Sequence, residues 1–159
     1  MVITVSTSRY GSHARGKRPA RDESGDLAQE LVGRSGGKVV ERVLVPDDPK
    51  MLRRAVSRAL RDGEVDALVL TGGTGVSTTD VTIETVRPLF EKEIEGFGEI
   101  FRFVSFQKIG SAAALSRATA GVSGGKVVMC LPGSPDGVRT ALDLFLGEVP
   151  HVLHLTRGP

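Results

Sequence analysis

Residues 71 to 75 read Thr-Gly-Gly-Thr-Gly and directly follow an apolar run, and Asp80 stands five residues beyond them. Glycines at the end of a strand allow backbone N–H groups to approach an anion closely, and a helix that follows adds the positive end of its dipole. This pattern predicts a cradle for a phosphate or a carboxylate. The alternative is a turn that uses glycine only for its positive φ angles. The candidate binding residues are Thr71, Gly72, Gly73, Thr74 and Gly75.

Hydroxyls, carboxylates and glycines also follow the other three strands that the sequence predicts. They lie at 6–9 (Ser-Thr-Ser-Arg), at 45–48 (Val-Pro-Asp-Asp) and at 132–135 (Pro-Gly-Ser-Pro). In an open parallel α/β sheet, ligands bind just beyond the carboxyl ends of the strands. We therefore expect these segments to contribute to the same site as the glycine-rich turn.

Two aspartates near these strand ends are candidates for metal binding and catalysis. Asp47 lies beside the rigid Pro46, and Asp80 lies just past the glycine-rich turn. A hard cation that bridges phosphate oxygens prefers oxygen ligands, so Asp47 and Asp80 predict a magnesium-dependent reaction at a phosphate. By contrast, Asp48 is explained as a helix cap and Asp136 as an acid in the first turn of a helix.

Other kinds of site are not supported by the residues. The segment 11–18 nearly fits the spacing of a P-loop, but Arg18 stands where a Ser or Thr is required. No G-x-G-x-x-G follows a predicted strand, so a dinucleotide-binding fold is not expected. The three histidines, His13, His151 and His154, offer no metal-binding set, and we interpret them as surface residues.

The overall composition is that of an ordinary globular protein. The chain has 159 residues, 40% of them apolar, and a net charge of +2, which predicts one domain over 1–159 and no nucleic-acid partner. No signal peptide and no run of 18 apolar residues is found, so we expect no membrane partner and a cytoplasmic location. The single cysteine, Cys130, lies in an apolar run and is interpreted as a buried thiol.

Strands and helices alternate along the chain, which predicts an α/β fold with a mainly parallel sheet. Strands are predicted at 1–8, 38–45, 65–70 and 126–131, and helices within the segments 24–37, 46–63 and 135–149. In the second of these segments Asp48 is the cap, Pro49 the first helical residue and Gly63 the residue that closes the helix. A long loop should follow the first strand. Between Thr82 and Gly125 we expect two or three helical pieces, interrupted at Pro88 and at 96–98, that leave the sheet.

Five motifs follow one another in a fixed order along nearly the whole chain. They are Asp-Glu-Ser-Gly at 22–25, VPDD at 45–48, TGGTG with Asp80-Val81-Thr82, EGFGEIFRFVSFQKIGSAAALSRATAG at 95–121, and LPGSP at 131–135. In this order and spacing they resemble the MoaB/Mog family of molybdenum cofactor biosynthesis proteins. The resemblance implies a three-layer α/β/α domain that assembles as a homotrimer or a dimer of trimers.

The resemblance also implies an activity. Active members of the family are adenylyltransferases that use ATP and Mg²⁺ to convert molybdopterin into adenylylated molybdopterin, with release of pyrophosphate. A further protein then inserts molybdate or tungstate. Attack of one phosphate on another brings two polyanions together, so the site must offer N–H donors and a metal rather than a covalent nucleophile.

The resemblance assigns roles to individual residues of this chain. Asp80 matches the catalytic aspartate and Asp47 the second acidic position, so both are expected to hold Mg²⁺. Contacts with the pterin or its phosphate are expected from Ser116, Arg117, Pro132, Gly133 and Ser134. Alternatively, Arg117 forms a salt bridge at a subunit contact and Ser134 caps the helix that follows it.

The chain departs from the family pattern just before Asp80. Family members often carry a basic residue there, whereas this chain has Ser77-Thr78-Thr79. Hydrogen bonds from Thr78 and Thr79, or charge from Arg9 or Lys17, could take its place.

Because of this departure, the sequence allows a second function besides the enzyme: a non-catalytic molybdopterin-binding or carrier protein of the same fold. A third possibility is an unrelated nucleotide-binding or sugar-phosphate enzyme that shares only the sheet.

Overall fold

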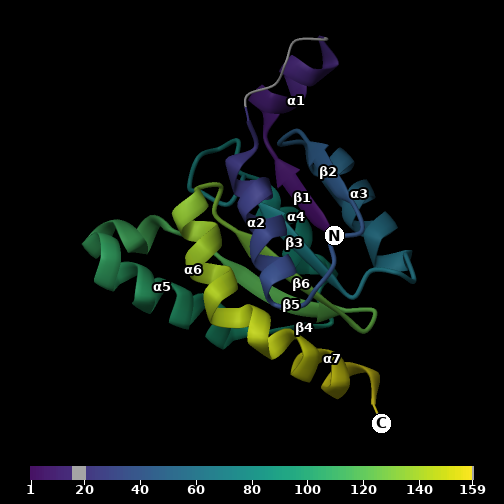
Figure 1. Ribbon diagram of the computed structural model, residues 1–159. Helices are drawn as coiled ribbons and strands as arrows, with labels where there is room; N and C mark the ends of the chain where they lie inside the picture. Colours follow the sequence, from purple (N-terminus) through teal and green to yellow (C-terminus); the bar gives the residue numbers. More distant parts are fainter. Residues whose placement is uncertain (16–20, 159) are drawn as a thin grey trace.

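A single sheet lies at the centre of the structure, a computed structural model that describes residues 1–15 and 21–158 (Figure 1). Its strands are β1 (Val2–Val5), β2 (Arg42–Val45), β3 (Ala67–Thr71), β4 (Lys92–Glu93), β5 (Thr119–Ser123) and β6 (Lys126–Leu131). They lie in the order β2-β1-β3-β6-β5-β4. The first four in this order are parallel, and β5 and β4 add to the edge as antiparallel strands.

Helices connect the strands and cover the sheet. The α-helices are α1 (Thr7–Ala14), α2 (Glu23–Arg34), α3 (Pro49–Arg61), α4 (Thr82–Val86), α5 (Glu95–Ile109), α6 (Pro135–Phe145) and α7 (Val149–Arg157). Short 3₁₀ turns follow at η1 (Arg87–Leu89), η2 (Gly110–Leu115) and η3 (Leu146–Glu148). Within the described residues, none of the helices is long and apolar enough to cross a membrane.

The sheet lies between two layers of helices, which confirms the three-layer α/β fold. α3 and α4 pack on one face, and α2, α5 and α6 pack on the other, where α7 extends the layer (Figure 1). The strand β6 shows why two layers are needed. Val127 and Met129 point into one core and Val128 and Cys130 into the other, because successive side chains of a strand alternate between its faces. Burial raises the pKa of the Cys130 thiol, as expected of a structural cysteine.

Polar caps fix where the helices begin. The carboxylate of Asp48 accepts a hydrogen bond from the N–H of Met51 at 2.7 Å, and Pro49 is the first residue of α3, as predicted. Asp22 caps α2 in the same way through the N–H of Gly25, at 3.1 Å. Each cap satisfies a backbone donor that the first turn of a helix leaves without a partner.

Two helices were missing from the prediction. Residues expected to form a long loop after the first strand instead form α1, which Ser6 caps by accepting from the N–H of Arg9. α1 buries none of its residues, so no apolar stripe signalled it. α7 follows Phe145 after one 3₁₀ turn and was also not expected. The predicted second strand was too long, since residues 38–41 precede β2 as irregular chain.

The prediction for the region between Thr82 and Gly125 was partly wrong. It contains the expected helical pieces, but it also returns to the sheet as β4 and β5. β5 joins β6 through a two-residue turn in which Gly124 and Gly125 have φ angles of 57° and 69°. A Gly-Gly pair between two strand segments is a hairpin signal, because the favoured turn needs positive φ at both positions.

The expected interruption at 96–98 does not occur. α5 runs straight through these residues. Gly98 lets the helix lie close to the start of β5, since a Cβ at Gly98 would lie 2.7 Å from the carbonyl oxygen of Ala118, just before that strand. The glycine is needed for packing and does not end the helix.

Gly121 in β5 offers a direct test of how tightly this added edge is packed. A Cβ on Gly121 would lie 2.4 Å from ring carbons of Phe90 and 2.8 Å from the carbonyl oxygen of Lys92. We expect Gly121→Ala to destabilise the fold by about 1–3 kcal/mol, measured by denaturant unfolding. Gly147→Ala is the matched control, because a Cβ there would meet no atom within 4 Å. Equal stability of the two variants would contradict the packing described here.

Candidate functional site

The turns that follow β3 and β6 are joined by hydrogen bonds. The N–H of Gly72 donates to the carbonyl of Leu131 at 3.1 Å, and the hydroxyl of Thr71 donates to the carbonyl of Pro132 at 2.9 Å. The two strands are parallel neighbours, so their carboxyl ends lie side by side. The glycine-rich turn and the Pro-Gly-Ser turn therefore form one continuous surface.

A cavity of about 340 Å³ lies against this surface. Its lining comes from three separate parts of the chain, the glycine-rich turn with Asp80, the segment before β5, and the turn after β6. The lining residues are Gly73, Thr74, Gly75, Asp80, Leu115, Ser116, Arg117, Pro132, Gly133 and Ser134. All of them except Leu115 were predicted from the sequence as site residues. Thr71, Gly72 and Asp47 are not part of the lining.

The conformation of the glycine-rich turn requires glycine at two positions. Gly72 and Gly73 have φ angles of 100° and 61°, in the region that other residues rarely adopt. A Cβ on Gly72 would lie 2.3 Å from the carbonyl oxygen of Val5 in β1. The turn thus passes directly over the carboxyl end of β1. β1 lies between β2 and β3 in the sheet, so the strand order reverses there, and ligands bind at such points in open α/β sheets.

Asp47 is held beside this turn by the first residue of α1. Its Oδ2 accepts hydrogen bonds from the N–H of Thr7 at 2.9 Å and from the Thr7 hydroxyl at 2.7 Å. Its Oδ1 faces the turn, since a Cβ on Gly73 would lie only 2.7 Å from it. The carboxyl ends of β1 and β2 therefore meet the glycine-rich turn, as the sequence predicted.

Asp80 lies on the cavity side of the same turn. Its Oδ2 accepts a hydrogen bond from the N–H of Ser77 at 2.9 Å and would lie 2.7 Å from a Cβ on Gly75. The two predicted carboxylates therefore both contact the glycine-rich turn, one at Gly73 and the other at Gly75. Within residues 1–15 and 21–158, no group of three or more His, Cys, Asp or Glu side chains is arranged to hold a metal ion.

Arg117 binds to the turn and to an acidic residue of α4. Its Nε donates to the carbonyl of Thr74 at 2.9 Å, and its two Nη atoms lie 2.5 and 3.3 Å from the carboxylate oxygens of Glu84. The hydrogen bond from Arg117 lowers the pKa of Glu84. Arg117 thus forms a salt bridge within the chain, whereas the alternative interpretation placed its salt bridge at a subunit contact, which stays a prediction.

Ser134 caps α6, as its alternative interpretation proposed. Its hydroxyl oxygen accepts from the N–H of Gly137 at 3.2 Å, and the residue still lines the cavity. The preceding turn is tied to α2 as well, because the buried hydroxyl of Ser24 donates to the carbonyl of Gly133 at 2.7 Å. The sequence motif at 22–25 thus contributes indirectly to the site.

Other residues considered from the sequence lie elsewhere. Arg9 lies on α1, where its Nη2 donates to the carbonyl of Arg21, and it does not line the cavity. Lys17 lies outside the described residues. The segment 11–18, which resembled a P-loop, is helical at 11–14 and lies in part outside the described residues.

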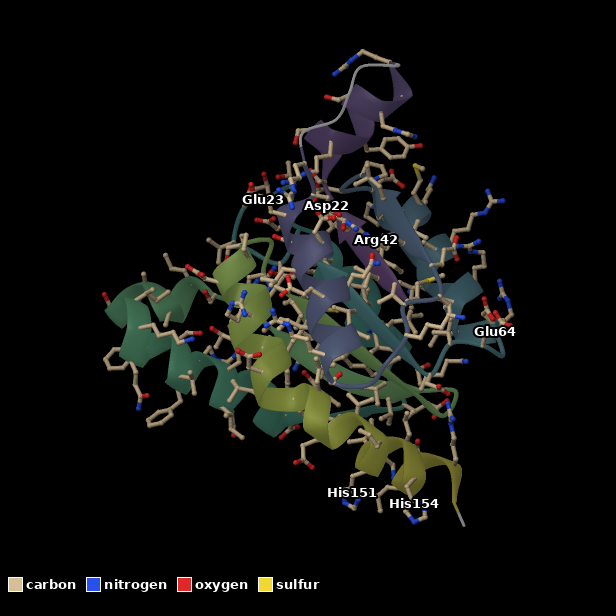
Figure 2. The ribbon with its side chains drawn as sticks, in the orientation of Figure 1. Asp22, Glu23, Arg42, Glu64, His151 and His154 are labelled. Carbon is tan, nitrogen blue, oxygen red and sulfur yellow. The ribbon has the colours of Figure 1, made fainter. Side chains whose placement is uncertain are left out.

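The histidines are exposed, as predicted. Figure 2 shows His151 and His154 on α7, at the end of the molecule opposite Asp22 at the start of α2. A mostly apolar cavity of about 260 Å³ also lies near α7 and the amino ends of the strands. None of the predicted site residues lines that cavity, and its apolar walls offer few groups for chemistry.

Sequence reasoning missed three residues that build the site. Ser24 and Thr82 stand in sequence motifs without an assigned role, and Glu84 was not singled out from the sequence. Each of them contacts a backbone carbonyl or a side chain far away in the sequence. The sequence signal for these residues was a hydroxyl or carboxylate at the start of a helix, next to a glycine-rich turn. The same signal also fits an ordinary helix cap, so it did not identify them as site residues.

Comparisons with known proteins find relatives along nearly the whole chain. The family model described as "Probable molybdopterin binding domain" matches residues 1–153. A protein of Methanocaldococcus jannaschii named "Probable molybdopterin adenylyltransferase" is 40% identical, over 99% of this chain and 93% of its own length. A protein of Pyrococcus furiosus named "Molybdopterin adenylyltransferase" is 42% identical, over 98% of this chain and 89% of its own length.

A solved structure shows the same fold. It is described as the tungsten cofactor synthesizing protein MoaB from Pyrococcus furiosus, and it superposes with a TM-score of 0.86 at 42% identity, covering 99% of this chain and 95% of that one. From its fold, its motifs and these relatives, the chain belongs to the MoaB/Mog family of molybdopterin-binding proteins.

Proposed function

We propose that this protein is a molybdopterin adenylyltransferase of molybdenum or tungsten cofactor biosynthesis. It transfers AMP from ATP to the terminal phosphate of molybdopterin and releases pyrophosphate. The observation that carries the proposal is the cavity at the carboxyl ends of the strands, where the glycine-rich turn, Asp80 and the Ser116-Arg117 segment come together. The names of relatives that align with nearly the whole chain support it.

The reaction requires a site for two polyanions. An oxygen of the molybdopterin phosphate attacks the α-phosphorus of ATP, and the bond from that phosphorus to the oxygen bridging to the β-phosphate breaks. Pyrophosphate leaves with the electron pair of that bond. Such a transfer depends on positioning and on donors for the negative charge, and it needs no covalent nucleophile. We assign the phosphate contacts to the turn formed by Thr71, Gly72, Gly73, Thr74 and Gly75.

Asp47 and Asp80 are suited to hold Mg²⁺. Each has one carboxylate oxygen bound to a backbone N–H, while its other oxygen, Oδ1, accepts no hydrogen bond from a described residue. Mg²⁺ is commonly held by one or two carboxylates together with substrate phosphates, so a pair of carboxylates is sufficient. The bound ion would neutralise charge that develops on the phosphate oxygens. Asp80 would in addition orient the attacking phosphate.

The opposite wall of the cavity is assigned to molybdopterin. Ser116, Arg117 and Ser134 present polar atoms there, and Pro132 and Gly133 shape the turn between them. Arg117 already gives three donor bonds to Thr74 and Glu84, so it acts on the ligand from a fixed position. Fixed donors lose little freedom when a substrate binds.

The proposal extends to assembly and partners. We propose a homotrimer or a dimer of trimers of one domain, residues 1–159, located in the cytoplasm, with a molybdate- or tungstate-inserting protein downstream. The exposed apolar side chains of Ile100, Phe103, Phe106 and Ile109 on α5 support a subunit contact, because water-exposed apolar stripes of this kind are usually covered. Neither nucleic acid nor a membrane is a partner in this proposal.

A second candidate is a molybdopterin carrier without catalysis. It is favoured by one observation: among the described residues that line the cavity, Arg117 is the single cation, and Glu84 neutralises it. The positions before Asp80 are Ser77, Thr78 and Thr79, which add hydroxyls but no charge.

The two candidates differ in turnover. We expect the protein, incubated with molybdopterin, ATP and Mg²⁺, to form adenylylated molybdopterin and pyrophosphate in equal amounts, detected by chromatography and mass spectrometry. Removal of Mg²⁺ with EDTA should stop the reaction, because the charge of two polyanions would then be left without a counter-ion. Tight binding of molybdopterin with no product would support the carrier instead.

Substitution of the two aspartates tests their roles. Asp80→Asn should lower kcat/KM by about 100-fold or more and Asp47→Asn by at least about tenfold, because each loses a charge close to the reacting phosphates. Both variants should fold, since an amide oxygen can still accept the hydrogen bonds from Ser77 and Thr7. Steady-state kinetics and circular dichroism measure the two effects.

Asp48→Asn is the matched control. Asp48 is adjacent to Asp47 but caps α3, and asparagine is an equally good cap, so its activity should equal that of the unmodified protein. A similar loss in Asp48→Asn, or full activity of Asp80→Asn, would contradict the assigned roles.

A further inference from the structure

Three consecutive carbonyl groups of the glycine-rich turn are bound from outside the turn. The hydroxyl of Thr82 donates to the carbonyl of Gly72 at 2.8 Å, and the N–H of Thr82 donates to the carbonyl of Gly73 at 2.9 Å. Nε of Arg117 donates to the carbonyl of Thr74 at 2.9 Å. Each oxygen therefore has a defined direction that the turn alone would not impose.

These bonds also fix the direction of the neighbouring N–H groups. A peptide unit is planar and trans, so its C=O and N–H point in opposite directions. The carbonyls of residues 72 and 73 are turned toward the buried Thr82, so the N–H groups of Gly73 and Thr74 point the other way, while the N–H of Gly75 points away from Arg117. These three residues line the cavity, and their N–H groups donate to no described residue. Successive N–H groups directed at one space form an anion-binding concavity.

Thr82 is placed to hold this arrangement rigidly. It is fully buried and is the first residue of α4. Its hydroxyl oxygen would lie 2.5 Å from a Cβ on Gly73, so it is packed directly against the turn. α4 also carries Glu84, which binds Arg117, so both groups that hold the carbonyls depend on this short helix.

We propose that Thr82 is a positioning residue, which binds no substrate itself but directs the N–H groups of Gly73 and Thr74 into the cavity to receive a phosphate. The inference rests on the proposed function, because it explains how the cradle for the polyphosphate is held. Thr82 stands two residues after Asp80, so one short segment supplies both a carboxylate at the site and the group that orients the anion donors.

The test compares three variants of the full chain with inorganic pyrophosphate as the probe. Thr82→Val removes the hydroxyl with little change in shape, Thr82→Ser keeps it, and Thr85→Val is the control. Thr85 is a buried threonine of α4 whose hydroxyl makes no hydrogen bond with a described residue. By calorimetry, Thr82→Val should bind pyrophosphate about tenfold more weakly than the unmodified protein. Thr82→Ser and Thr85→Val should stay within about twofold of it.

A second measurement does not depend on a variant that folds. In the ¹⁵N-labelled unmodified protein, the amide resonances of Gly73 and Thr74 should move downfield on addition of pyrophosphate, as expected of donors to an anion. In Thr82→Ser they should move likewise. Pyrophosphate that binds without shifting these two resonances would overturn the inference, even if Thr82→Val does not fold.

The outcomes separate this inference from the proposed function. Equal affinity of Thr82→Val and the unmodified protein for pyrophosphate, or no binding to either, overturns the role of Thr82, whereas formation of adenylylated molybdopterin decides the function independently. A protein whose affinity for pyrophosphate depends on Thr82 but which forms no product would keep the inference and refute the enzyme. Loss of affinity in Thr85→Val equal to that in Thr82→Val would also overturn the inference, since a general effect on α4 would then explain both.

Discussion

The site depends on where the carbonyl groups of one glycine-rich turn are directed. A backbone segment can present a row of N–H groups to an anion only if its carbonyls are satisfied on the other side. Here Thr82 and Arg117 donate hydrogen bonds to the carbonyls of residues 72–74. The positive φ angles of Gly72 and Gly73 allow the turn to adopt this shape, and the donors from outside hold it there. The glycines are therefore necessary for the cradle but do not by themselves create it.

The sheet supplies the frame in which these donors meet. Because β3 and β6 are parallel neighbours, the turns after them bond to each other, and the first turn of α2 holds the second of these turns through Ser24. That turn of α2 is itself anchored. The carboxylate of Asp22 accepts from the hydroxyl of Thr4 at 2.7 Å and from Arg42 at 2.8 Å, which ties α2 to β1 and β2 (Figure 2). A ligand here would bind to a preorganised surface.

The side chains of the site contribute little net positive charge. Two carboxylates contact the turn, and the cation of the cavity wall is paired with Glu84, so the protein presents little net positive charge to two polyanions. Backbone N–H groups and a bound cation must then supply most of the attraction. Carboxylates repel phosphate when alone, so their place on either side of the turn supports the proposed Mg²⁺, of whose binding site they would form part.

The sequence by itself determined the α/β fold, the caps at Asp48 and Ser134, and nearly every residue that lines the cavity. It could do so because apolar periodicity, capping residues and glycine-rich strand ends are local patterns, and because a parallel sheet brings strand ends together. Ser116 and Arg117 are the exception, since only the resemblance to the MoaB/Mog family pointed to them. The antiparallel β4 and β5, the helix α1 and the bonds made by Thr82 were decided only by the tertiary structure. β4 has only two residues, β5 (Thr-Ala-Gly-Val-Ser) is made mostly of small residues with a glycine at its centre, and α1 buries nothing, so none of them has a strong pattern of its own. The choice of Gly72 as the partner of Thr82 depends on packing between segments that no local spacing encodes.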